Sequence, residues 1–98
     1  MADTTTTTIT PAIAEANLLL DSIQHLCTSE WASKGHQWVR NYLRARAQGT
    51  GLHLDLEMYA SECERPQLVW AAHAALDGSR EFLLAHLKAY VAIAAVQS

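Results

Sequence analysis

The segment LHLDLEM at residues 52–58 decides whether this 98-residue chain is all-helical or mixed. Its apolar and polar residues alternate strictly, which is typical of a half-buried strand. Leu, Glu and Met are nevertheless strong helix formers, and one helical face holds Leu52, Leu56, Tyr59 and Cys63. A single strand would find nothing to pair with except the Thr-rich stretch near the N-terminus. We therefore predict a helix over residues 52–64, ending before the next proline.

The segments on either side carry clear helix signals. The preceding helix begins within Ser29–Gly35, which holds two candidate serine caps, and runs to Ala47 before a glycine. The following helix opens with Pro66, in a first turn where the missing N–H of proline costs nothing, and ends at Leu76 before an Asp-Gly pair. The apolar faces expected on these two helices contain Val39, Tyr42, Leu43 and Ala47, and Leu68, Val69, Ala72, Ala75 and Leu76.

The N-terminal part predicts a tail followed by a helix. Residues 1–10 are rich in threonine, which is β-branched and resists helix formation, so we expect a loose tail there or, alternatively, a short strand. From Pro11 onward, apolar residues recur at three- and four-residue spacing and predict a helix over residues 11–27. Five helices with short connections predict an all-α bundle that forms a single domain over residues 11–98.

The last helix, which Ser79 is expected to cap, is apolar nearly all round. Only a narrow line of residues looks suited to water, namely Glu81, Ala85, Lys88 and Ala92. A helix of this kind either lies at the centre of the fold or is covered by another chain. We keep both alternatives and name Tyr90 and Ile93 as candidate partner-binding residues in the second one.

Composition and charge exclude several classes of protein. The chain carries 7 Lys and Arg against 10 Asp and Glu, a net charge of −3, which argues against a dedicated nucleic-acid binder. Apolar residues make up 50 %, too many for a disordered chain, yet no apolar run reaches the roughly 18–20 residues of a membrane span. The first residues lack a secretory signal pattern, and Cys27 and Cys63 stand too far apart for a disulfide scaffold, so we expect a cytoplasmic protein.

Two groups of residues are candidates for binding a partner. Arg40 and Arg44 lie one helical turn apart and form a candidate recognition face for phosphate or an acidic protein, unless they pair with the acids of residues 55–64. Trp31 and Trp38 belong to a residue type enriched at interface hot spots, unless they fill an alanine-rich core. We place Trp31 in a loop, where an interface role and a core role are equally expected.

Residue pairs that would support catalysis are few. Asp21 with His25, and His53 with Glu57, are each four residues apart, but a metal site needs further ligands. His73 and His86 are candidates to face one another across a helix pair. The sequence contains no glycine-rich phosphate loop, no GxSxG elbow and no HExxH motif. We therefore expect no catalytic residue, no metal, no cofactor and no enzymatic activity.

These observations favour a non-enzymatic protein–protein interaction module, a small inhibitor or regulator of another protein. Single-domain inhibitors of bacteria and phages, such as anti-CRISPR, immunity and antitoxin proteins, share this size and plain composition. A first alternative is a homodimeric bundle with a small apolar ligand pocket, for which Trp70, Tyr90 and Met58 are the candidate lining. A second alternative is a weak DNA-binding regulator that uses the helix of Arg40 and Arg44.

Overall fold

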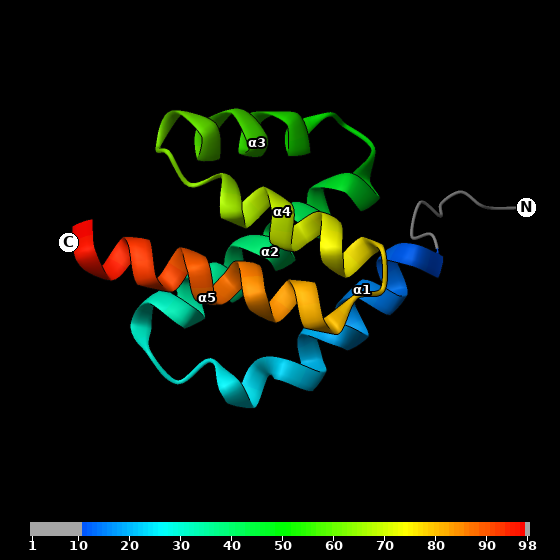
Figure 1. The fold of residues 1–98 in the computed structure, drawn as a ribbon. Helices are drawn as coiled ribbons and strands as arrows, with labels where there is room; N and C mark the ends of the chain where they lie inside the picture. Colours follow the sequence, from blue (N-terminus) through cyan, green and yellow to red (C-terminus); the bar gives the residue numbers. More distant parts are fainter. Residues whose placement is uncertain (1–10, 98) are drawn as a thin grey trace, which may run out of the picture.

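A computed structural model describes residues 11–97, and these residues form an all-α bundle (Figure 1). Within them lie five α-helices and one short 3-10 turn, with the bounds α1 Pro11–Ile23, η1 Gln24–Leu26, α2 Glu30–Gln48, α3 Leu52–Glu62, α4 Pro66–Leu76 and α5 Arg80–Gln97. The predicted all-α fold is confirmed, including the helix at 52–58. The tail or strand expected at residues 1–10 lies outside the described residues.

The helix ends follow the signals in the sequence. Ser29 caps α2, because its Oγ accepts a hydrogen bond from the Ala32 N–H at 3.1 Å. Ser79 does the same for α5, accepting from the Phe82 N–H at 3.2 Å. The prediction that Trp31 lies in a loop is wrong: α2 begins at Glu30 as soon as the serine cap is in place, so Trp31 lies in its first turn.

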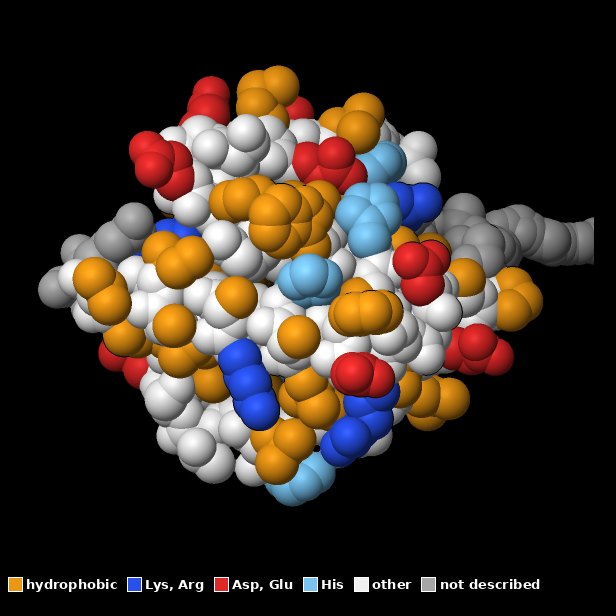
Figure 2. Space-filling model, in the orientation of Figure 1, with side chains coloured by type: hydrophobic (Ala, Val, Ile, Leu, Met, Phe, Trp, Pro, Cys, Tyr) orange, Lys and Arg blue, Asp and Glu red, His pale blue; other side chains and the backbone are white. Residues whose placement is uncertain are grey.

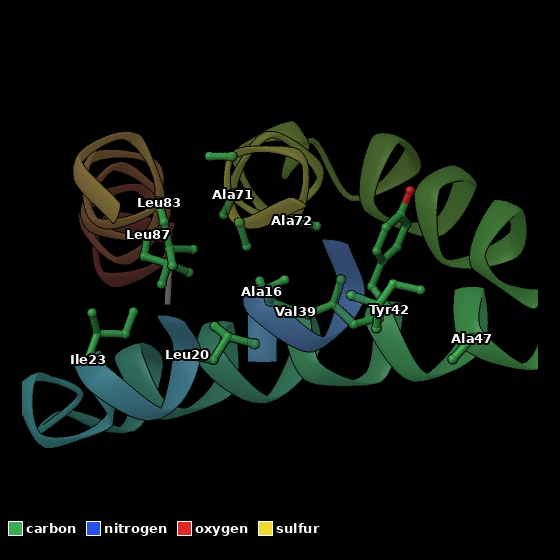
Figure 3. Close-up of a cluster of buried hydrophobic side chains, with 14 residues drawn as sticks. Ala16, Leu20, Ile23, Val39, Tyr42, Ala47, Ala71, Ala72, Leu83 and Leu87 are labelled. Carbon is green, nitrogen blue, oxygen red and sulfur yellow. The ribbon is translucent and has the colours of Figure 1, made fainter. Parts of the chain in front are cut away.

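Four helices form the main core. α4 and α5 pack against each other and against α2, and α1 packs on α2 and α4. In Figure 3, Leu83 from α5 and Ala71 from α4 point toward α1 and α2. The largest of the fully buried side chains are Tyr42, Leu20, Ile23, Leu43, Leu83 and Val39. The face predicted for α2 is therefore buried, and the alanines of α4 let the helix backbones approach closely.

α3 lies at the edge of this core and packs mainly against α2 and α4 (Figure 1). The helical face shared by Leu52, Leu56, Tyr59 and Cys63 is mostly exposed, since Leu52 and Tyr59 are 50 % and 61 % exposed and Cys63 is also exposed. Ala60 alone of this helix is buried, with Leu56 packed partly against the core. The alternating sequence spreads leucines around the whole helix, so its pattern does not single out one face.

α5 buries one side against α2 and α4 and exposes the other, so of the two alternatives kept for it, the fully enclosed central helix does not describe it. It buries a stripe against α2 and α4 that includes Leu83, Leu87 and Tyr90. The predicted water-facing line from Glu81 to Ala92 is exposed, and so are the apolar side chains of Phe82 and Val96. None of the helices within the described residues is both long enough and apolar enough to cross a lipid bilayer.

Candidate interaction surfaces

Three of the predicted partner-binding residues come together in one hollow. Trp31 and Trp38 from α2 line it with Tyr90 from α5, and the rings of Trp31 and Tyr90 meet edge to face with centres 6.4 Å apart. The hollow has a volume of about 290 Å³. We call it the aromatic hollow; its lining is Trp31, Lys34, Trp38, Tyr59, Ala60, Cys63, Arg65, Leu68 and Tyr90.

Two cations lie over the rings of the aromatic hollow. The Lys34 Nζ is 4.6 Å from the centre of the Trp31 ring, and the Arg65 guanidinium is 5.7 Å from that centre and 5.5 Å from that of Tyr90. Such contacts stabilise by about 0.5–1 kcal/mol at exposed sites. The nearby Glu30 carboxylate is 3.6 Å from Lys34, in an exposed pair within the first turns of α2. The hollow is therefore both aromatic and positively charged.

The indole N–H of Trp38 has no hydrogen-bond partner among the described residues, although the nitrogen is buried. Buried donors without a partner are uncommon in folded proteins, because each one loses its hydrogen bond to water. The Trp38 ring itself is held in place by stacking on Tyr42, with centres 5.5 Å apart and an interplanar angle of 18°. Trp38, which lines the aromatic hollow, thus carries a buried donor with no partner among the described residues.

Gly35 lets α5 approach α2 closely at this point. A Cβ atom at Gly35 would lie 3.0 Å from Cδ2 of Tyr90 and 3.3 Å from Cδ2 of Leu87. Real Cβ atoms rarely come so close to a ring carbon. The lack of a side chain at Gly35 therefore allows the Tyr90 ring to pack against α2. The position of Tyr90 in the aromatic hollow depends on this contact.

A second aromatic group lies on the outer face of α4 and α5. The His86 ring is 5.8 Å from the Trp70 ring and 6.4 Å from the Phe82 ring, and Trp70 and Phe82 are 50 % and 60 % exposed. Figure 2 looks onto this face and shows hydrophobic side chains over α4 and α5 with histidines among them. The His73 ring contacts the Tyr42 ring, with centres 6.1 Å apart.

The other predicted binding residues are separate from the aromatic hollow. Arg40 donates a hydrogen bond to the Asp21 carboxylate of α1 within an ion pair, so it does not present a free guanidinium beside Arg44. Arg44 lines shallow hollows on the surface, one of which also has Asp55 in its lining. Ile93 is half-buried on α5 and is not among the residues that line the aromatic hollow.

The structure places Tyr90 apart from Trp70 and Met58, the other two residues named for a ligand pocket. Tyr90 is buried against α2 and lines the aromatic hollow, whereas neither Trp70 nor Met58 lines it. Met58 lies on α3 with 61 % of its surface exposed. The spacing of these residues on separate helices carried no information about which sides of the helices would meet.

A polar link joins α3 to α2. The Tyr42 hydroxyl donates a hydrogen bond to the Glu57 carboxylate and accepts one from Arg46 Nη1 at 3.3 Å. Burial of the phenol, followed by the hydrogen bond to Glu57, raises the pKa of Tyr42. Arg46 of α2 and Glu57 of α3 therefore meet at one shared tyrosine hydroxyl.

One buried polar residue escaped the sequence analysis. His36 is 5 % exposed, and its Nε2 lies 2.8 Å from the Leu20 carbonyl oxygen, which ties α2 to α1. Its spacing from Val39 and Leu43, on the apolar side of α2, is the signal that would have placed it inside. Among residues 11–97, no group of three or more His, Cys, Asp or Glu side chains is arranged to hold a metal ion.

No protein-family model, curated protein or solved structure matches this chain. Its surfaces and hollows are therefore the basis for the function proposed below.

Proposed function

We propose that the protein is a non-enzymatic interaction module that inhibits or regulates another protein through the aromatic hollow. The observation that carries this proposal is the composition of the hollow: Trp31, Trp38, Tyr59, Tyr90 and Arg65 converge there. Trp, Tyr and Arg are the residue types that contribute most to binding at protein interfaces, especially where they form a pocket. We also propose a cytoplasmic location, which the two free cysteines, Cys27 and Cys63, support.

The charge of the hollow selects the kind of side chain that would enter it. Lys34 and Arg65 lie over its rings. An acidic side chain flanked by an apolar one would meet cations and aromatic rings at the same place. We therefore propose that the partner presents an acidic and apolar segment to this surface.

The test is a comparison of variants in affinity capture. The immobilised chain is exposed to lysate of the source organism, and bound proteins are identified by mass spectrometry for the wild type, Trp31→Ala and Trp70→Ala. We expect a partner retained by the wild type and by Trp70→Ala, which alters the other aromatic face, and lost with Trp31→Ala. Retention of every partner by Trp31→Ala would contradict the proposal.

A second candidate function is self-association, favoured by the exposed aromatic face of α4 and α5. Trp70 and Phe82 expose half or more of their surface there, beside His86, and contiguous exposed apolar patches often mark interfaces. Light scattering across a wide concentration range decides between a monomer and a homodimer. If the chain is a dimer, Phe82→Glu should reduce the mass to that of a monomer without loss of helicity.

A further inference from the structure

A groove runs between the start of α2 and one side of α5, and no residue lines both this groove and the aromatic hollow. The segment Leu26–Ser29 and Ala32 form one wall, and α5 forms the other. The α5 residues recur every three or four positions, so they share one side of the helix: Leu84, Leu87, Lys88, Val91 and Ala92. The groove has a volume of about 460 Å³, within the roughly 300–1,000 Å³ typical of small-molecule sites.

The groove is apolar because of the side chains that form its floor. Leu87 is buried beneath it, and Leu84 and Val91 are half-buried beside it. Ala32 and Ala92 stand on opposite walls, where longer side chains would fill the space. An alkyl chain lying here would cover apolar surface that is otherwise in water, and each buried methylene group stabilises the bound state.

Lys88 is the one charged residue in the groove lining. It makes no ion pair with any of the residues that the structure describes, whereas Lys34, the other lysine of the chain, pairs with Glu30. No carboxylate lines the groove. Figure 2, which looks onto α5, shows basic side chains among hydrophobic ones along the lower side of this helix. An apolar groove with a single cation is complementary to an apolar molecule with a single negative charge.

Cys27 adds a neutral group to the same wall. Its thiol lies 3.7 Å from the Ile23 carbonyl oxygen, to which it donates a hydrogen bond, and partial burial raises its pKa. The side chain therefore stays in the thiol form at neutral pH and places no negative charge near Lys88. The hydroxyl groups of Thr28 and Ser29 lie on the same segment of the lining.

We propose that this groove binds a medium-chain alkyl monocarboxylate, with the alkyl chain against Leu84, Leu87 and Val91 and the carboxylate at the Lys88 ammonium. The proposal is independent of protein–protein contact at the aromatic hollow, since the two places share no lining residue.

The test uses the two cysteines of the chain as reporters. Cys27 lines the groove, whereas Cys63 is exposed and lines the aromatic hollow. Sodium decanoate, kept below its micelle concentration, is added to the full-length protein, and alkylation of each cysteine by iodoacetamide is followed by mass spectrometry. We expect alkylation of Cys27 to slow about tenfold when nine-tenths of the chains are occupied, since only free chains react. Alkylation of Cys63 should keep its rate.

Substitutions test separately whether decanoate binds in the groove and whether Lys88 recognises its carboxylate. Ala92→Phe fills the groove from an exposed position and should abolish the protection of Cys27. Lys88→Gln should weaken decanoate binding about fivefold, the upper range for an exposed ion pair. Lys88→Arg keeps the charge and Lys34→Gln alters the unrelated lysine, so both should bind as the wild type does. Uncharged decanamide should bind the wild type about as weakly as decanoate binds Lys88→Gln.

Three results would overturn the proposal. In the first, decanoate leaves the rate at Cys27 unchanged. In the second, it slows both cysteines equally, as a detergent acting on the whole chain would do. In the third, decanamide protects Cys27 as well as decanoate does, which would show that Lys88 does not recognise a carboxylate.

Discussion

The four helices α1, α2, α4 and α5 bury their apolar side chains together, whereas α3 is attached along one edge. The first group contains Leu20, Val39 and Leu83, each with none of its surface exposed. On α3, Leu54 and Met58 are 57 % and 61 % exposed, and Ala60 is the buried residue. Apolar burial therefore holds four helices, while α3 depends on a small contact and on the polar link from Tyr42 to Glu57.

This difference bears directly on the aromatic hollow, because its two sides come from the two regions. Trp31, Trp38 and Tyr90 belong to the well-packed helices, and Tyr59 and Cys63 belong to α3 and its end. Segments with few buried apolar contacts open more readily than the core does. We therefore expect the α3 side of the hollow to open locally while the side formed by α2 and α5 keeps its shape.

The largest expected effect comes from truncating the core. Leu20→Ala should lower the free energy of unfolding by about 2–5 kcal/mol, because the lost side chain leaves a cavity among packed helices. Leu54→Ala on α3 should change the same quantity by no more than about 0.5 kcal/mol, as is usual for exposed positions. Urea unfolding followed by far-UV circular dichroism measures both. Equal losses of unfolding free energy in the two variants would contradict the division between the four well-packed helices and the loosely attached α3.

Tyr42→Phe tests the link between the two regions. Removing the hydroxyl should cost about 1.5–3 kcal/mol, the range for a hydrogen bond to a charged group. Amide hydrogen exchange should then accelerate throughout α3 and much less in α5. Glu57→Gln is the matched control, since the amide keeps an acceptor for the Tyr42 hydroxyl. Exchange that accelerates equally in α3 and α5 would contradict the local role of this link.

The same tyrosine gives a pH dependence whose sign follows from its pKa. The folded chain raises the pKa of Tyr42 above its ordinary value of 10.0, chiefly through burial. The stability that comes from the neutral phenol is therefore complete below pH 10.0 and is lost as the pH rises through the raised pKa. Tyr42→Phe should remove this alkaline loss, which urea titrations between neutral and strongly alkaline pH measure.

Gly35→Ile tests the close packing of α2 against α5 within the well-packed group of four helices. The added side chain would meet the Tyr90 ring, and we expect a loss of about 1–3 kcal/mol, as for other overpacked cores. Ser33→Ile is the comparison variant: it places the same side chain at an exposed position of α2 and removes only the hydrogen bond from Ser33 to the Cys27 carbonyl oxygen. An equal loss of stability in the two variants would show that the Tyr90 ring moves aside and does not resist the added side chain. Urea midpoints at neutral pH make the comparison.

The smallest effect is expected at the surface pair of Arg40 and Asp21. Asp21→Asn should lower stability by about 0–1 kcal/mol in low salt, because the carboxylate is mostly exposed and well solvated. The difference from the wild type should shrink in high salt, where the attraction is screened. A difference that stays constant between low and high salt would contradict an electrostatic origin.

The sequence predicts the helices well because their ends carry chemical signals. Serines at 29 and 79, Pro66 and the glycines at 49 and 51 mark boundaries that the structure confirms, and the two glycines adopt positive φ angles of 68° and 84°. These signals act within a few residues of the chain. They can therefore be identified from the sequence without any knowledge of the tertiary contacts.

The site was less predictable because it depends on which sides of the helices meet. Residue type indicates Trp31 and Trp38 and the apolar last helix indicates Tyr90, but nothing in their spacing shows that the three share a hollow. Arg65 lies over two of the aromatic rings, a contact that no local pattern predicts. The close approach between α2 and α5 at Gly35 likewise has no signal in the neighbouring residues.

The three tryptophans of the chain have three different surroundings. Trp38 stacks on Tyr42, Trp31 lies under two cations, and Trp70 stands beside His86 on the outer face. Because the emission of an indole depends on its neighbours and on water, each ring is a built-in optical probe of one part of the molecule. A set of variants that keeps one tryptophan and replaces the other two by phenylalanine would let the core, the hollow and the outer face be observed separately in solution.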